Sequence, residues 1–171
     1  MDIYICRLGN FEKIVSKNQL LVCTGIGADK IPIYEDQAAA YGLDFSGFST
    51  QAAFLDYDGD GDLDILLSGE NSSVQRFSII YRNDGGAFVN INAGLEGVGI
   101  ASAAWGDYDG DGDLDILLSG RTSDAQLISR IYRNDSGVFT DIAAGLEGVY
   151  QASVAWGDYD GDGDLDVLLT G

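Results

Sequence analysis

The stretch AAWGDYDGDGDLDILLSG, residues 103–120, decides the fold of this chain of 171 residues. Its centre, DYDGDGDLD, occurs at residues 56–64, 107–115 and 158–166, so successive copies start 51 residues apart. The flanks repeat as well, with AAFL, AAWG or VAWG before the centre and ILLSG or VLLTG after it. Self-similarity at a fixed period of this size indicates a repeat architecture.

Within each repeat the apolar runs are short, rich in β-branched and aromatic residues, and bounded by Gly, Asn and Asp, which is typical of strands. In the middle copy we expect strands over residues 100–105, 115–120, 127–133 and 138–142. The NDGG and NDSG segments favour tight hairpins, and no segment has a sustained helical period. The pattern predicts an all-β chain, a β-propeller or propeller segment with four-stranded antiparallel blades.

The repeat period divides the chain into blades at residues 51–101 and 102–152, and the first half of a third blade at 153–171. Residues 1–50 are a degenerate lead-in repeat: Ile3 and Tyr4 reproduce the offsets of Ile80 and Tyr81, and residues 20–25 resemble ILLSG without an aspartate loop. We expect the N-terminal strands, over residues 2–14, to complete the last blade, within one chain or between two chains that close a ring. The alternative is a part of a longer propeller with open strand edges.

Each DYDGDGDLD segment places five carboxylates within nine residues and contains no basic residue. Two unit charges about 4 Å apart at an effective dielectric constant near 20 repel each other by about 4 kcal/mol. A solvated acidic turn would explain one such segment, but three copies favour a bound cation. Carboxylate oxygens without Cys or His select Ca²⁺ over transition metals, and Mg²⁺ requires stricter geometry. We therefore expect three calcium sites.

The spacing assigns a role to each aspartate. Loop positions 1, 3 and 5 point their carboxylates inward, position 7 offers its backbone carbonyl with its carboxylate turned to solvent, and position 9 closes the ring of ligands. Gly at position 6 supplies the positive φ of a sharp turn. Position 12 is Leu instead of Glu, which excludes an EF-hand. The predicted ligands are Asp56, Asp58, Asp60, Asp62 and Asp64; Asp107, Asp109, Asp111, Asp113 and Asp115; and Asp158, Asp160, Asp162, Asp164 and Asp166.

The composition excludes several classes of protein. The net charge of −19 argues against nucleic acid and anionic membranes as partners. The lack of His removes Ser-His-Asp catalysis and His-containing zinc sites. No charge-free stretch exceeds 11 residues, too short to span a bilayer, and we expect no signal peptide in this chain. Cys6 and Cys23 are expected to be strand thiols, with one disulfide as the alternative.

The stretch AAWGDYDGDGDLDILLSG, together with IYRND and a following Phe, resembles the FG-GAP or VCBS repeats of bacterial surface proteins. It is also similar to the calcium-binding blades of integrin α-subunit propellers. The resemblance covers residues 51–171. It implies calcium in the loop that joins the first two strands of a blade, an extracellular or cell-surface location, and roles in adhesion or carbohydrate recognition. The family's propellers commonly have more blades than the three aspartate loops of this chain account for.

A loop with four carboxylates and a carbonyl around an ion leaves little room for a substrate, so we expect the calcium to be structural. The favoured hypothesis is a non-enzymatic interaction or adhesion module with a protein or carbohydrate ligand. The alternatives are a lectin-like propeller or the non-catalytic part of a polysaccharide-active enzyme. Phe54, Trp105 and Trp156 are expected to pack between strands, and Arg82 and Arg133 to pair with nearby aspartates.

Overall fold

The computed structural model describes residues 3–5, 17–71 and 73–171, and this part of the chain contains strands and no helix. The all-β prediction is therefore confirmed for the described residues. The strands are β1 (Ile3–Ile5), β2 (Gln19–Ile26), β3 (Pro32–Asp36), β4 (Gly47–Leu55), β5 (Asp64–Asn71), β6 (Arg76–Asp84), β7 (Ala87–Asn90), β8 (Val98–Gly106), β9 (Asp115–Thr122), β10 (Leu127–Asp135), β11 (Val138–Asp141), β12 (Ser153–Gly157) and β13 (Asp166–Thr170).

Two sheets have four antiparallel strands each, in the orders β4-β5-β6-β7 and β8-β9-β10-β11. Each strand of the second sheet agrees with its predicted range to within two residues at either end. A two-stranded sheet, β12-β13, follows them, and a three-stranded sheet, β1-β2-β3, precedes them. The prediction of four-stranded antiparallel units is confirmed, because consecutive strands pair through short turns within each unit.

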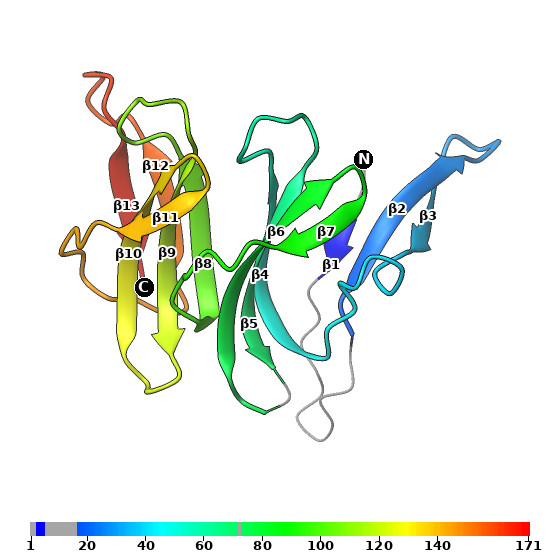
Figure 1. Cartoon of the computed structure of the whole chain (residues 1–171), viewed down its shortest axis with the longest axis horizontal. Coiled ribbons are helices and arrows are strands. Elements are labelled where there is room, and N and C mark those ends of the chain that lie inside the picture. Colours follow the sequence, from blue (N-terminus) through cyan, green and yellow to red (C-terminus); the bar gives the residue numbers. More distant parts are fainter. Residues whose placement is uncertain (1–2, 6–16, 72) are drawn as a thin grey trace.

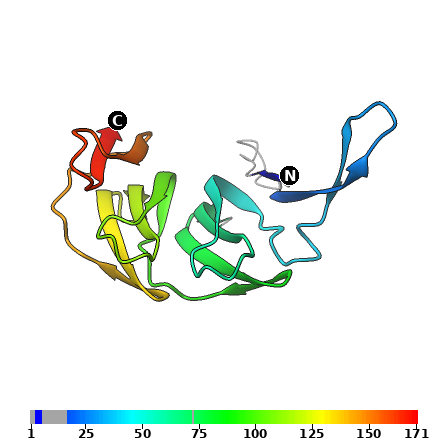
Figure 2. The same cartoon turned by 90° about the horizontal axis from the view of Figure 1, so that it is seen from above.

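The four sheets stand side by side in the order of the chain, as Figure 1 shows. Seen from above, they form an open arc, with the β1-β2-β3 sheet at one end and β12-β13 at the other (Figure 2). The first strands of successive units face each other, since β8 packs against both β4 and β12. The described residues of one chain therefore make an arc of sheets and not a closed ring.

Apolar side chains alternate between the two faces of each sheet, as the period of a strand requires. On β5, Leu66 packs toward the second four-stranded sheet, whereas Ile65 and Leu67 pack toward the N-terminal sheet. On β9, Leu117 packs toward the β12-β13 sheet. All four side chains are at most 1% exposed, so the core lies at the interfaces between sheets.

The N-terminal sheet has the register of strands two to four of a complete unit. Its paired residues Ile3, Leu21 and Asp36 correspond to Ile65, Tyr81 and Asn90 in the next sheet. An Asx turn ends β3 and β7 alike: the Asp36 carboxylate accepts from Ala38 N at 3.1 Å, and the Asn90 side chain accepts from Asn92 N at 2.8 Å. β1 therefore corresponds to β5, β2 to β6, and β3 to β7.

In the structure two parts of the lead-in repeat lie in other strands than the sequence alignment predicts. Ile3 and Tyr4 lie in a strand equivalent to β5, not in the place of Ile80 and Tyr81, and residues 20–25 lie in the equivalent of β6. Both placements follow from the hydrogen-bonded pairing of the strands. The irregular spacing of residues in this segment does not show that pairing. Within the chain β1 pairs with β2, while residues 2 and 6–14 of the segment expected to complete the last blade, and Cys6, lie outside the described residues.

Candidate metal centre

Each aspartate loop joins the first two strands of its unit, between β4 and β5, β8 and β9, and β12 and β13. Position 6 has a φ of +93° at Gly61 and +97° at both Gly112 and Gly163. A side chain there would be strained. The predicted left-handed glycine is confirmed in all three loops, and it turns the chain sharply enough to bring the start and end of the loop together.

The turn gathers three carboxylates in every loop, those of positions 1, 3 and 9. One oxygen from each lies within 4.8 Å of the other two. The three groups are Asp56, Asp58 and Asp64; Asp107, Asp109 and Asp115; and Asp158, Asp160 and Asp166. An arrangement of this kind concentrates hard oxygen donors of the type that calcium prefers.

The carboxylates at position 5 are not members of these groups. Each accepts a hydrogen bond from the backbone N–H two residues later, at 2.8 Å for Asp60 and Asp111 and 2.9 Å for Asp162. They form Asx turns that shape the second half of the loop. Their predicted role as calcium ligands stays a prediction.

The carboxylate at position 9 connects the loop to the third strand. Asp64 has no exposed area; its Oδ2 accepts from Tyr57 N at 3.0 Å and its Oδ1 from Asn83 N at 2.8 Å. Asp115 repeats the arrangement with Tyr108 and Asn134. Burial raises the pKa of Asp64 and of Asp115, and the two backbone donors lower each pKa in part. A cation at this point would favour the charged form.

Position 7 differs from the prediction in the first two loops. The Asp62 carboxylate accepts from Gly85 N at 2.9 Å, and the Asp113 carboxylate accepts from Ser136 N at 2.7 Å. The Asp62 carboxylate thus connects its loop to the β6-β7 hairpin, and the Asp113 carboxylate connects its loop to the β10-β11 hairpin. Neither carboxylate turns to solvent as predicted. The donors lie 23 residues further along the chain, a distance that loop spacing alone does not reveal. Asp164 in the third loop is exposed.

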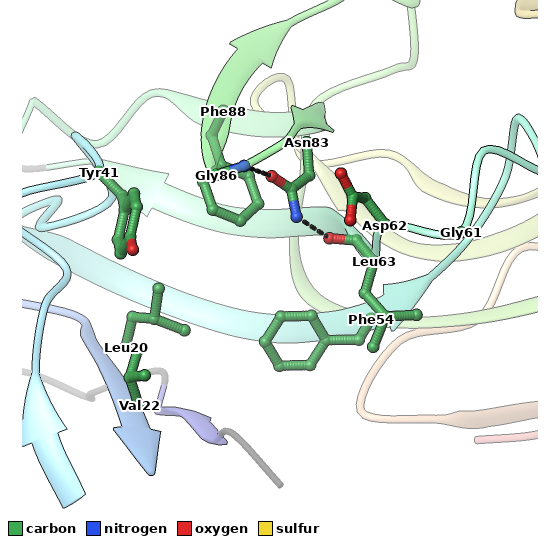
Figure 3. Close-up of a pocket in the computed structure, with 10 residues that line it drawn as sticks. All are labelled: Leu20, Val22, Tyr41, Phe54, Gly61, Asp62, Leu63, Asn83, Gly86 and Phe88. Carbon is green, nitrogen blue, oxygen red and sulfur yellow. Dashed lines mark hydrogen bonds between the residues drawn. The ribbon is translucent and has the colours of Figure 1, made fainter. Parts of the chain in front are cut away.

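Asn83 and Asn134, which the sequence pattern predicts only as turn residues, hold the other side of the first and second loops. Asn83 Nδ2 donates to Leu63 O at 3.1 Å, and its Oδ1 accepts from Gly86 N at 2.7 Å (Figure 3). Asn134 makes the same two bonds, to Leu114 O and from Gly137 N, and has no exposed area. The signal for this role was a constant distance of 19 residues between Asp64 or Asp115 and the Asn.

The donor set fits a divalent cation. Asp56 Oδ1 is buried without a hydrogen-bond partner among the described residues. None of the ion pairs in that part of the chain involves a loop carboxylate, because the nearby guanidiniums of Arg82 and Arg133 bind Asp84 and Asp135 at 2.7 and 2.8 Å. Within the described residues the clustered carboxylates therefore form no ion pair with a basic side chain.

The aromatic residues beside the loops pack mainly against other rings. Trp105 lies edge-on to Phe139 at 6.2 Å, and Trp156 stacks on Tyr108 at 6.1 Å. The packing predicted for both tryptophans is therefore confirmed. Phe54 remains 37% exposed and lines a pocket next to the first loop (Figure 3).

The fold and the loops define a class of protein, a tandem array of antiparallel β-sheets with an acidic loop in each unit. The family model of the FG-GAP-like repeat matches residues 56–118 and 119–169, and the chain belongs to this family. A search of the curated proteins finds no match. In the described part of the chain no helix has the length and apolar character needed to cross a membrane.

Proposed function

We propose that this chain is a calcium-binding β-propeller module of an extracellular or cell-surface protein, with one structural ion in each aspartate loop. The observation that carries the proposal is the convergence of the carboxylates of positions 1, 3 and 9 in all three loops. Membership of the FG-GAP-like family supports the propeller architecture and the extracellular location. Each ion would supply the positive charge that the loops lack.

The same geometry supports a structural role for the ion. Asp64 belongs to the carboxylate group and also accepts from the first residues of the loop and from β6. A cation held there would connect β4, β5 and β6 through a single side chain. Position 7 would add its backbone carbonyl, and position 5 its carboxylate after a change of rotamer.

An interaction role follows from the same features. The chain contains no His, and outside the metal loops no residue stands out as a positioned general base. The described part of the chain consists of antiparallel sheets joined by hairpins and loops, and a protein or carbohydrate ligand would bind to these features. We therefore propose that the module is not an enzyme.

Isothermal titration with Ca²⁺, together with metal analysis after gel filtration, tests the calcium sites. The wild-type chain should bind three ions, and the double variant Asp109→Ala, Asp111→Ala should bind two. Glu147→Ala, which removes an exposed carboxylate outside the loops, is the control and should bind three. A wild-type chain that binds no Ca²⁺ at millimolar concentration would disprove the proposal.

A further inference from the structure

Tyr57 is connected to all three carboxylates that converge in the first loop. It stands at loop position 2, directly between Asp56 and Asp58 in the chain. Its backbone N–H donates to Oδ2 of Asp64, the third member of the group, at 3.0 Å. Any change in the spacing of these carboxylates therefore acts on the backbone of Tyr57.

The side chain of Tyr57 is buried against the second four-stranded sheet. The residue is 6% exposed, and its ring lies 6.0 Å from the ring of Phe139 on β11, with 55° between the two planes. The ring also borders the turn between β10 and β11, because a Cβ atom added to Gly137 would lie 3.9 Å from Tyr57 Cε2. The first loop thus contacts the β10-β11 hairpin of the next unit through one buried ring.

The β10-β11 hairpin is also a part of the second metal centre. The backbone N–H of Asn134 donates to Oδ1 of Asp115, one of the convergent carboxylates, at 2.8 Å. The backbone N–H of Ser136 donates to the Asp113 carboxylate at 2.7 Å. A displacement of the hairpin therefore acts on a carboxylate of the second group and on the residue whose carbonyl we expect to bind the ion.

Phe139 has a second aromatic contact, to the strand that enters the second loop. Its ring lies 6.2 Å from that of Trp105, with 75° between the planes. Trp105 precedes Asp107 by two residues and pairs across the sheet with Ile116, the residue after Asp115. The ring of Phe139 thus contacts both the first loop and a strand that carries a carboxylate of the second group.

The equivalent ring of the preceding unit makes a similar contact without an aspartate loop. Phe88 corresponds to Phe139, and its ring lies 5.8 Å from that of Tyr41, with 82° between the planes. Tyr41 belongs to residues 37–46, between β3 and β4, which contain none of the three DYDGDGDLD segments. Phe88 is therefore a matched control for Phe139.

We propose that Tyr57 is a positioning residue for the second calcium site, and that its contact with Phe139 makes ion binding in the first and second loops positively cooperative. When the carboxylates around Tyr57 are neutralised, their repulsion ends and the ring of Tyr57 becomes fixed. The fixed ring orders the β10-β11 hairpin, so less conformational entropy is lost when the second loop binds its ion. This inference rests on the proposed calcium sites and adds their mutual dependence.

The expected effect follows from the size of the contact. Coupling between two sites typically changes affinity by about 5- to 150-fold, and the factor is the same in both directions. One contact between rings belongs at the lower end of that range, so we expect a factor of about five.

Isothermal titration with Ca²⁺ measures the coupling factor. The third site is removed throughout, and the first site, the second site or neither is removed as well. The coupling factor is the constant for binding both ions divided by the product of the two single-site constants. Each site is removed by Ala at loop positions 3 and 5, which are Asp58 and Asp60, Asp109 and Asp111, and Asp160 and Asp162.

Phe139→Leu should lower the coupling factor about fivefold, because the ring that connects the two loops is lost. Tyr57→Leu removes the same contact from the other side and should have the same effect, whereas Tyr57→Phe keeps the ring and should preserve the factor. The matched control Phe88→Leu should preserve it too. The charges removed with each site are the same in every background, so their effect cancels in these comparisons.

The coupling factor separates positioning from a merely structural role. A variant that only weakens each site lowers the single-site and two-site constants together and leaves the factor unchanged. Equal factors in the wild type, Phe139→Leu and Tyr57→Leu would therefore overturn the proposed coupling. If the wild-type chain binds three ions with such equal factors, only the coupling is wrong; if it binds no ions, the calcium sites are wrong as well.

Discussion

Single residues at the loops act mainly through groups far away in the chain. Asn134 connects the β10-β11 hairpin to the end of the second loop through two side-chain hydrogen bonds, from a fully buried position. Asn83 makes the same bonds but is only half-buried. Loss of a hydrogen bond is more costly when the remaining polar groups stay buried.

Asn134→Ala should therefore lower the free energy of unfolding by about 2–3 kcal/mol, since Leu114 O and Gly137 N, both in partly buried residues, lose their hydrogen-bond partner. Asn83→Ala should lower the free energy of unfolding by less, about 1 kcal/mol, because water can form hydrogen bonds with the backbone groups that lose the Asn83 side chain. Urea unfolding in the presence of Ca²⁺ measures both values. Equal losses would show that burial does not control the strength of this contact.

At the scale of the element, an aspartate loop acts together with the two strands that it joins and with the hairpin that follows them. The loop joins two strands, and the carboxylate at position 7 attaches it to the following hairpin. The third loop lacks this attachment among the described residues. In the first two loops the carboxylate of position 7 thus holds the hairpin, and the backbone carbonyl of the same residue would bind the proposed ion.

Asp113→Ala should lower the free energy of unfolding by about 1–2 kcal/mol through loss of the bonds to Ser136. The number of bound calcium ions should remain three, because the backbone carbonyl is retained. Thermal unfolding combined with metal analysis measures both effects. If one ion is lost with the side chain, the carboxylate itself is the ligand, and the assignment of the carbonyl is wrong.

At the scale of the whole molecule, packing between sheets stabilises the fold, and we expect neutralisation of the loop carboxylates by cations to add to it. The core lies at three interfaces between neighbouring sheets. A chain with a net charge of −19 repels itself in the compact state. Bound cations would reduce this repulsion at the points where it is strongest.

Removal of Ca²⁺ should therefore destabilise the entire arc. Each site adds about 2.7 kcal/mol at a hundredfold excess of Ca²⁺ over Kd, since the ion binds the folded state. Differential scanning calorimetry with Ca²⁺ and with EDTA should show a lower melting temperature in EDTA. Mg²⁺ at the same concentration should restore less of the difference. An unchanged melting temperature in EDTA would contradict a structural ion.

Much of the fold and part of the site could be predicted because their signals are local. The 51-residue period, the strands around DYDGDGDLD and the left-handed Gly61 depend on neighbouring residues and on turn geometry. The lead-in repeat pairs differently from the alignment that its sequence suggests, because Ile3 pairs with Leu21, 18 residues away, and Leu21 with Asp36, 15 residues away. Local pattern carries little information about such register in a degenerate repeat.

The sequence by itself determined that this is a repeated β-protein with three crowded carboxylate loops, since strand alternation, turn residues and charge density are properties of short segments. Only the tertiary structure decided which carboxylates converge, that Asp62 and Asp113 hold hairpins, and how the strands of the first sheet pair. These features depend on hydrogen bonds and packing between distant segments, and such contacts exist only once the strands have been placed side by side.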